Sequence, residues 1–259
     1  MRMREVRACK TGKEAGTGRR LGGLRRIGLV VLAAGASRRM GACKLVTPLV
    51  SLAPTPGIAS CDGPRGGETL LGRALATACA FAERTPAVVE VAAVTGAYRE
   101  MVAPVVAAAG VCELHNASWA AGQASSVALA ARHAWDGGLD ALLVMVADQP
   151  FVGAAHLARL VDGYLTSARA SSVSPCAWRA FQPSTGRRGN PCLFARPCLS
   201  LLAELSGDEG ARSLFRTHPD LPVCDVPFDD PLVFEDVDTP EEAARVTAML
   251  REEGCLYAL

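Results

Sequence analysis

Short apolar runs alternate with longer amphipathic segments through the first two thirds of the chain. Four apolar runs rich in β-branched residues predict buried strands, at residues 27–32, 87–95, 111–115 and 139–147. Segments with apolar residues at helical spacing predict helices among them, at residues 68–82, 98–109, in the stretch ending at Trp135, and at 153–167. The helix at 98–109 is expected despite the proline at position 104. Strands that alternate with helices of this length imply βαβ units.

The last third of the chain has shorter and less regular elements. We expect strands at 171–175, 177–182, 192–195 and 232–235, with a basic turn at 187–191. One helix is expected to end at His218. Another begins near Pro240, where Thr239 and Glu242 have the spacing of a capping box.

The alternation predicts an α/β protein of three layers, with helices on both faces of a mainly parallel sheet. Residues 1–25 are rich in Arg and Gly and poor in large apolar residues, so we expect a disordered basic extension before one domain at 26–253. Within it, the Pro-, Gly-, Ser- and Thr-rich stretch at 47–67 predicts a long loop.

The bulk composition excludes several kinds of partner and compartment. A net charge of +1 gives no argument for nucleic acid or an anionic membrane as a partner. No apolar run approaches the roughly 20 residues that span a bilayer, and no apolar segment follows the N-terminal charges as in a secretory signal. The ten cysteines form no CxxC pair and lie in apolar segments. These features predict a cytoplasmic protein with free thiols.

The first apolar run leads into a loop suited to bind phosphate. Its end, Ala33-Ala34-Gly35, lets backbone N–H groups approach a ligand, and the cations Arg38, Arg39 and Lys44 follow. The spacing of its glycines fits neither a P-loop nor a GxGxxG motif. Lys44 is the only lysine after residue 13, and an ammonium is not equivalent to a guanidinium. The alternative is a polar turn with a solvated cation.

Carboxylates follow two other predicted strands. Asp148 comes directly after the most apolar run, and Asp236 and Asp238 follow the run at 232–235. Ligands of parallel sheets bind at the carboxyl ends of strands, and carboxylate oxygens suit Mg²⁺ shared with substrate phosphates. We therefore expect Asp148 as a metal ligand, with either Asp236 or Asp238 as a second one. The alternative for Asp148 is a turn before Pro150.

The motif LAAGASRRMGACK at 32–44 resembles the signature LAAG-x-S-x-RMG-x-x-K of the MobA-like nucleotidyltransferases, and within them the molybdenum cofactor cytidylyltransferases. The resemblance extends over roughly residues 27–245. It implies a Rossmann-like nucleotidyltransferase fold in which the loop wraps the nucleotide while Arg39 and Lys44 neutralise the triphosphate. The nucleotide-binding positions that it implies are Leu32, Ala33, Ala34, Gly35 and Ser37, with Thr95, Asn116, Gly122 and Ser126 after later strands.

Three further segments resemble that family. The run from His115 to Ser126 is similar to its HN-x-x-aromatic segment over the nucleoside, although plain capping of the following helix would also explain it. The segment RGNPCLF is similar to the acceptor-side segment, which implies roles for Arg188 and Asn190; a solvated turn is the alternative. Asp208 lies in a GD-x-GAR segment on the acceptor side, or is the N-cap of the helix ending at His218.

The function that this resemblance implies is Mg²⁺-dependent transfer of CMP from CTP to the phosphate of molybdenum-bound molybdopterin, with release of pyrophosphate. The implied partners are therefore small molecules, with a molybdenum hydroxylase or its maturation factor as a protein partner. Within the same reaction class, the alternatives are a guanylyltransferase for the same cofactor and a sugar-1-phosphate nucleotidyltransferase. In another class, the alternative is a non-catalytic carrier of the cofactor.

Overall fold

The computed structural model describes residues 25–37, 39–49, 69–170 and 175–256. The expected N-terminal extension up to residue 24, most of the expected loop at 47–67 and most of the expected strand at 171–175 lie outside the described residues. The ends of that loop meet where Pro48 forms a β-bridge with Thr69.

Within the described residues, seven strands form one sheet in the order β3-β2-β1-β4-β6-β5-β7. They are β1 (Ile27–Ala33), β2 (Val88–Thr95), β3 (Cys112–His115), β4 (Ala141–Val146), β5 (Ala177–Phe181), β6 (Arg188–Ala195) and β7 (Val223–Pro227). Only β6 runs antiparallel to its neighbours β4 and β5; the other pairs are parallel. The prediction of an α/β fold with a mainly parallel sheet is confirmed.

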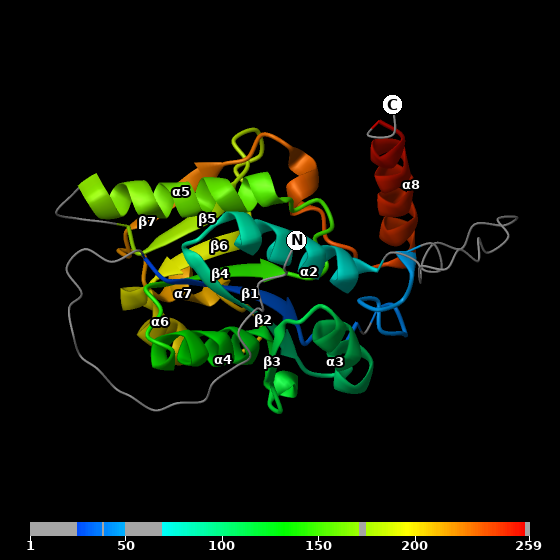
Figure 1. Ribbon diagram of the computed structural model, residues 1–259, viewed down its shortest axis with the longest axis horizontal. Helices are drawn as coiled ribbons and strands as arrows, with labels where there is room; N and C mark the ends of the chain where they lie inside the picture. The colour runs from blue at the N-terminus through cyan, green and yellow to red at the C-terminus, as the bar shows by residue number, and fades with distance from the viewer. Residues whose placement is uncertain (1–24, 38, 50–68, 171–174, 257–259) are drawn as a thin grey trace, which may run out of the picture.

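Helices cover both faces of this sheet (Figure 1). The helices are α2 (Leu70–Arg84), α3 (Arg99–Ala108), α4 (Gln123–Asp136), α5 (Ala154–Ala170), α6 (Arg196–Ala203), α7 (Arg212–Thr217) and α8 (Pro240–Leu256), with 3₁₀ turns η1 (Trp119–Ala121) and η2 (Pro231–Phe234). Of these, α8 stands beyond one end of the sheet (Figure 1). One buried cluster joins α2, α3 and α5 to one face of β1 and β4, and a second joins α4 and α6 to the other face. This is the expected three-layer arrangement.

The central strands are buried as their composition predicts. Every residue of β1 and β4 is buried, because these two strands pair with each other and have helices on both faces. The apolar face predicted for α2 is buried as well, and Thr69 caps that helix through its hydroxyl. Helix α3 continues through Pro104. The capping box at the start of α8 is confirmed by the bond from the Glu242 amide to the Thr239 hydroxyl and its reciprocal carboxylate contacts.

Three local predictions in the last third of the chain are wrong, and two elements there were not predicted. The run at 232–235 is not a strand: Pro231 begins the turn η2, Asp230 caps it, and its apolar side chains are buried in the core. A four-residue apolar run does not distinguish a strand from a buried turn. The expected basic turn already belongs to β6 at Arg188, while β7 and α6 have no counterpart among the predicted elements.

The third wrong prediction concerns helix α7. This helix does end at Thr217, next to the predicted His218, but its N-cap is Ala211 rather than Asp208. Two residues separate Asp208 from the cap position, so Asp208 does not cap this helix.

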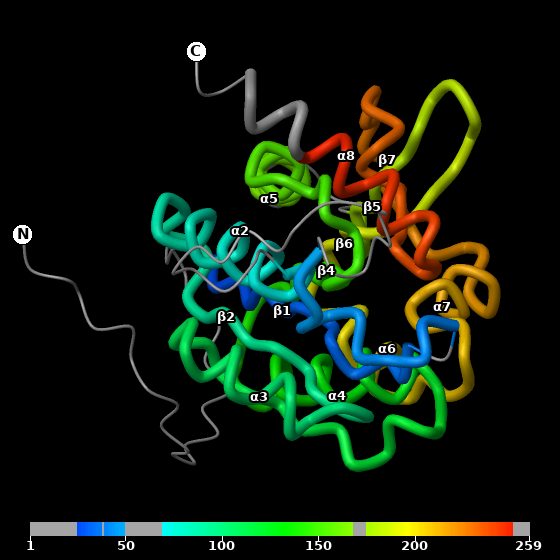
Figure 2. Tube along the Cα trace, turned by 90° about the vertical axis from the view of Figure 1, so that its right-hand side faces the viewer, coloured from blue at the N-terminus to red at the C-terminus, as the bar shows by residue number. Residues whose placement is uncertain are grey.

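The strand order reverses at β1, which has β2 on one side and β4 on the other. After β1 the chain continues to β2 on one side within the sheet, and after β4 it continues to β5 and β6 on the other side, as at a topological switch point. In Figure 2 the segment that follows β1 runs beside the start of α8 at this edge, where Thr247 of α8 donates a hydrogen bond to the Leu49 carbonyl.

Two predictions from composition can be compared with the described part of the chain. The cysteines at positions 43, 79, 112, 176, 192, 198 and 224 are all free thiols, as expected. No helix described there has the length and apolarity needed to cross a membrane.

Candidate active site

Three segments from distant parts of the chain meet beyond the carboxyl ends of β1 and β4. The loop after β1 brings Lys44, the residue after Ala147 brings Asp148, and the segment before α8 brings Asp238. The last segment is held in place because the Val237 amide donates to the Asp148 carbonyl at 3.0 Å and the Val237 side chain is fully buried. The predicted edge of the sheet is therefore the one where these charges gather.

Lys44 is the centre of this group. Its ammonium nitrogen lies 2.8 Å from a carboxylate oxygen of Asp148 and 2.8 Å from one of Asp238. Its side chain is only 8% exposed. Burial would lower the pKa of Lys44, but the charge of Asp148 and the hydrogen bonds to both carboxylates outweigh burial and raise it. Lys44 and Asp148 are therefore in direct contact.

The two C-terminal aspartates have different surroundings. Asp238 binds Lys44 and forms an ion pair with Arg39 at 3.1 Å. Burial would raise the pKa of Asp238, but the hydrogen bond and charge of Lys44, with the charge of Arg39, hold the pKa below its ordinary value. Asp236 instead accepts a hydrogen bond from Gln149 at 2.8 Å, and burial together with the charge of Asp148 raises its pKa. Asp238 is therefore the partner of Asp148.

The donor set suits a hard divalent cation. Oxygens of Asp148 and Asp238 converge on one cation position, which Lys44 holds. Among the described residues, no three His, Cys, Asp or Glu side chains are grouped to hold a metal by themselves. Mg²⁺ at nucleotide sites needs only one or two carboxylates, because substrate phosphates and water supply its other ligands. Asp148 and Asp238 therefore fit Mg²⁺ held together with a triphosphate.

The loop after β1 is tied to the neighbouring strands. Leu32, Ala33 and Ala34 are buried and Gly35 is exposed. The Leu32 carbonyl accepts from Ala147, and the Ala34 carbonyl accepts from Ala97 beyond β2. Ser37 has a left-handed backbone, with φ of 45°. Its hydroxyl is buried and finds no hydrogen-bond partner in the part of the chain that the structure describes. The backbone groups that can meet a ligand at the carboxyl edge of the sheet therefore begin at Gly35.

The side chains predicted to lie over the nucleoside bind one another. Asn116 donates from its amide nitrogen to Ser125 at 2.8 Å and to Ser126 at 2.9 Å, and its oxygen accepts from the Ser118 amide. Thr95 is fully buried and donates to Glu113 at 2.6 Å. Asn116 and Ser126 are brought together as predicted, but these bonds fasten the turn after β3 to the start of α4.

Gly122 and Asp208 come together although they are far apart in sequence. The Gly207 carbonyl accepts from the Ala124 amide at 3.0 Å, so the segment before α7 covers the N-terminus of α4. A Cβ at Gly122 would lie 2.4 Å from that carbonyl oxygen and 2.5 Å from an Asp208 carboxylate oxygen. The Gly207 carbonyl therefore occupies one of the first N–H groups of α4.

On the acceptor side, Arg188 and Asn190 lie in β6. Since β6 is antiparallel to β4, its first residues lie toward the carboxyl end of β4. Asn190, which precedes a cis proline, therefore lies near the same edge as Asp148. Arg188, however, donates to Asp225 at 2.8 Å and covers the Phe181 ring. The structure thus directs Arg188 toward the β5–β7 side.

Two further residues face the carboxylates. Arg187, one of the two arginines of the predicted basic turn, lies 3.5 Å from an Asp236 oxygen, with its guanidinium over the Phe234 ring. Gln149, which no motif singled out, is 7% exposed, donates to Asp236 and has a buried side-chain oxygen with no partner among the described residues. The only sequence signal for Gln149 was its position directly after Asp148.

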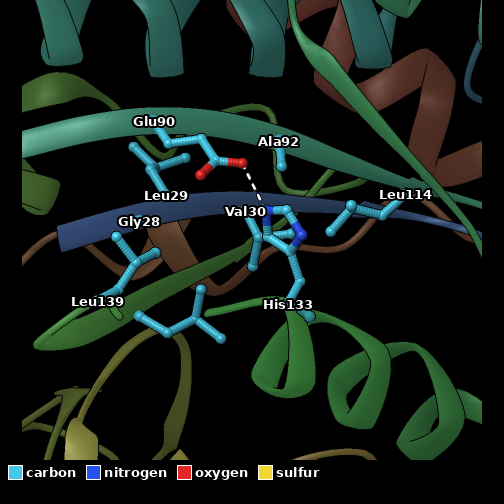
Figure 3. Close-up of a pocket in the computed structure, with 10 residues that line it drawn as sticks. Gly28, Leu29, Val30, Glu90, Ala92, Leu114, His133 and Leu139 are labelled. Carbon is cyan, nitrogen blue, oxygen red and sulfur yellow. Dashed lines mark hydrogen bonds and ion pairs between the residues drawn. The ribbon is translucent and has the colours of Figure 1, made fainter. Parts of the chain in front are cut away.

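A small cavity elsewhere in the fold is not part of this edge (Figure 3). It lies between β1, β2 and α4, near the amino ends of β1 and β4, where Gly28 faces Leu139. Glu90 and His133 form an ion pair at its wall. Ligands of parallel sheets bind at the opposite, carboxyl ends, so the candidate site is the group around Lys44.

The comparison with protein families agrees with this geometry. Residues 29–221 match the model of the MobA-like NTP transferase domain. The chain belongs to this family of nucleotidyltransferases. The segment at 236–238, which carries Asp238, lies beyond the matched region.

Similar proteins lie at moderate to low identity. The purine catabolism protein PucB of Bacillus subtilis is 33% identical over 121 residues, which cover 47% of this chain and 54% of PucB, so the chain matches about half the length of that relative. A homologue of Mycobacterium tuberculosis rv0371c from Mycobacterium sp. strain JC1 has a TM-score of 0.65 at 27% identity, covering 88% of this chain and 99% of that one. A manganese complex of Rv0371C from M. tuberculosis H37Rv has a TM-score of 0.59 at 22% identity, covering 86% and 98%, and it supports the fold alone.

Proposed function

We propose that this member of the MobA-like family transfers CMP from CTP to the terminal phosphate of molybdenum-bound molybdopterin and releases pyrophosphate. The observation that carries the proposal is the contact of Lys44 with Asp148 and Asp238 at the edge where the loop after β1 ends. It brings a phosphate-binding cation and two metal-binding carboxylates to one place, as transfer from a triphosphate requires.

In this reaction an oxygen of the acceptor phosphate bonds to the α-phosphorus while the bond from that phosphorus to the bridging oxygen of pyrophosphate breaks. A phosphate monoester is already a nucleophile at neutral pH, so no side chain has to remove a proton. The chain's residues position the groups: the backbone from Gly35 holds the nucleotide, while Lys44 and Arg39 neutralise its phosphates. Mg²⁺, held by Asp148 and Asp238, would stabilise the negative charge that develops on the phosphate oxygens.

The acceptor would approach over the start of β6. Arg187 and Gln149 supply donors and an acceptor beside Asp236, and the Phe234 ring lies under Arg187. Asn190 lies in the first part of β6, at the same edge of the sheet. The modified cofactor would serve a molybdenum hydroxylase. The proposed protein partner is such a hydroxylase or its maturation factor.

The test is an assay of pyrophosphate release with each of the four NTPs, Mg²⁺ and molybdenum-bound molybdopterin. We expect release with CTP and a cytidylylated product by mass spectrometry. Asp148→Asn should lower the rate by about a hundredfold or more, as loss of a charge-stabilising contact does. Asp162→Asn is the matched control, because Asp162 is exposed on α5, away from this edge, and should keep the wild-type rate.

Each alternative has its own outcome in this assay. Release with GTP alone would identify a guanylyltransferase, and release only with a sugar 1-phosphate as acceptor would replace the molybdopterin acceptor. If all four NTPs are inert while Asp148→Asn still delivers cofactor to a hydroxylase, the protein is a carrier and the transferase proposal fails.

A further inference from the structure

Lys44 holds the position between two carboxylates that suits a metal ion. The ammonium nitrogen lies 2.8 Å from oxygens of both Asp148 and Asp238, and the lysine side chain is 8% exposed. Two carboxylates that share one cation repel each other when that cation leaves. Lys44 is therefore the counter-ion of these two carboxylates, in addition to any contact that it makes with substrate.

We infer that Lys44 is a displaceable counter-ion: a divalent cation that enters between Asp148 and Asp238 displaces the ammonium, which then turns to the triphosphate. This inference rests on the proposed function for the destination of the ammonium, but the displacement itself depends only on the three side chains. It gives Lys44 a place in the order of binding, because metal entry and release of the phosphate-binding cation become one event.

The chemistry of the side chain supports exchange. An ammonium on a flexible four-carbon stem is a compact point charge, whereas a guanidinium would form a fork of fixed geometry with a carboxylate. In a chain that otherwise uses arginine, Lys44 is the only lysine between residues 14 and 259. The position where a cation has to leave its partners is thus the one that carries an ammonium.

The charge balance supports it as well. Asp148 and Asp238 with Lys44 carry a net charge of about −1, and a divalent ion in place of the ammonium would bring that sum to zero. Arg39 also pairs with Asp238, at 3.1 Å, but its side chain is 72% exposed. Water screens such a pair, so Arg39 competes with a metal far less than Lys44 does.

The first experiment measures binding of Mn²⁺ alone, with no nucleotide or acceptor, by electron paramagnetic resonance. Lys44→Met should bind Mn²⁺ about tenfold more tightly than the wild type, since the competing charge is gone. Lys44→Arg keeps the charge and should not gain affinity, and Arg39→Met is the matched control and should change it by less than about twofold. Unchanged or weaker binding by Lys44→Met would overturn the inference.

The second experiment uses the wild-type protein and so does not depend on the folding of a variant. Acylation of lysines by a water-soluble ester is followed by mass spectrometry with and without saturating Mn²⁺. Lys44 should react severalfold faster with Mn²⁺, while Lys10 and Lys13 serve as internal references. A Lys44 that stays equally protected would overturn the inference. Neither experiment contains CTP or molybdopterin, so its result is independent of whether the transfer reaction is found.

Discussion

Replacing Lys44 by methionine tests whether the ion pairs of the site also stabilise the fold. The variant keeps the length of the side chain and removes its charge. In the wild type, Lys44 donates charged hydrogen bonds to Asp148 and Asp238, both at 2.8 Å. Hydrogen bonds between charged groups contribute about 1.5–3 kcal/mol each when well shielded. The two carboxylate side chains are 29% and 36% exposed, so water screens part of this.

We therefore expect Lys44→Met to lower the free energy of unfolding by about 2 kcal/mol, because it also leaves two carboxylates without a counter-ion. The pKa of Lys44 is raised, so its contribution is complete below its unfolded pKa of about 10.4 and is lost as the pH rises through the folded pKa. The pKa of Asp238 is lowered, so its contribution is present above its unfolded pKa of about 3.9 and is lost as the pH falls through the folded pKa. The difference should be constant between about pH 5 and pH 9.

Urea unfolding followed by circular dichroism measures this difference. Arg39→Met removes the other cation of Asp238, which is mostly exposed, and should cost less than about 0.5 kcal/mol. The double variant Lys44→Met with Asp238→Asn should recover part of the loss, because the repulsion between the carboxylates is gone. If Lys44→Met unfolds like Arg39→Met, or if the double variant recovers nothing, the reasoning about a shared counter-ion is wrong.

Three further predictions concern other parts of the molecule. Gly122→Ala should lower the free energy of unfolding by more than about 2 kcal/mol, because φ at Gly122 is 102° and the new Cβ would meet the Gly207 carbonyl. Gly35→Ala is the control for stability, since no atom lies within 4 Å of the Cβ that it adds. It should unfold like the wild type and weaken only nucleotide binding. The hydrogen bond and charge of Glu90 raise the pKa of His133. The wild type should therefore be more stable than Glu90→Gln below about pH 6.5 and should lose this advantage as the pH rises through the folded pKa of His133. Urea unfolding at a series of pH values measures the difference. Arg187→Met should raise the KM for the acceptor severalfold, because Arg187 faces the carboxylate of Asp236. Arg188→Met should leave this KM near the wild-type value, because Arg188 binds Asp225 instead. Equal effects of the two variants in steady-state assays would contradict the role of Arg187 in acceptor binding.

The fold was predictable where periodicity and length were both strong. Every residue of β1 and β4 lies between two layers of helices, so an unbroken apolar run has a single interpretation there. The run at 232–235 has only three apolar residues before Glu235, and Pro231 and Asp230 turn it into η2. The strand predicted there is wrong, because both strands and short turns bury such residues.

The site was predictable where residues follow central strands. Asp148 lies two residues after β4 and Lys44 lies in the loop after β1, so topology alone brings them to one edge. The choice between Asp236 and Asp238 depends on which side chain the extended segment turns toward Lys44, and the sequence pattern contains no signal for that. Arg187 and Arg188 are a similar case, since adjacent residues of a β-ribbon point to opposite faces.

The antiparallel β6 gives the active edge a connection of a different kind from those beside it. In a wholly parallel sheet every connection at this edge would lead from a strand into a βα unit. Here the turn at 183–187 leads from β5 directly back into β6 as a hairpin, so its length and sequence are free to vary without moving the loop after β1. Grafting this turn from a relative with a different acceptor is thus a way to exchange the molecule that receives the nucleotide while the nucleotide stays the same.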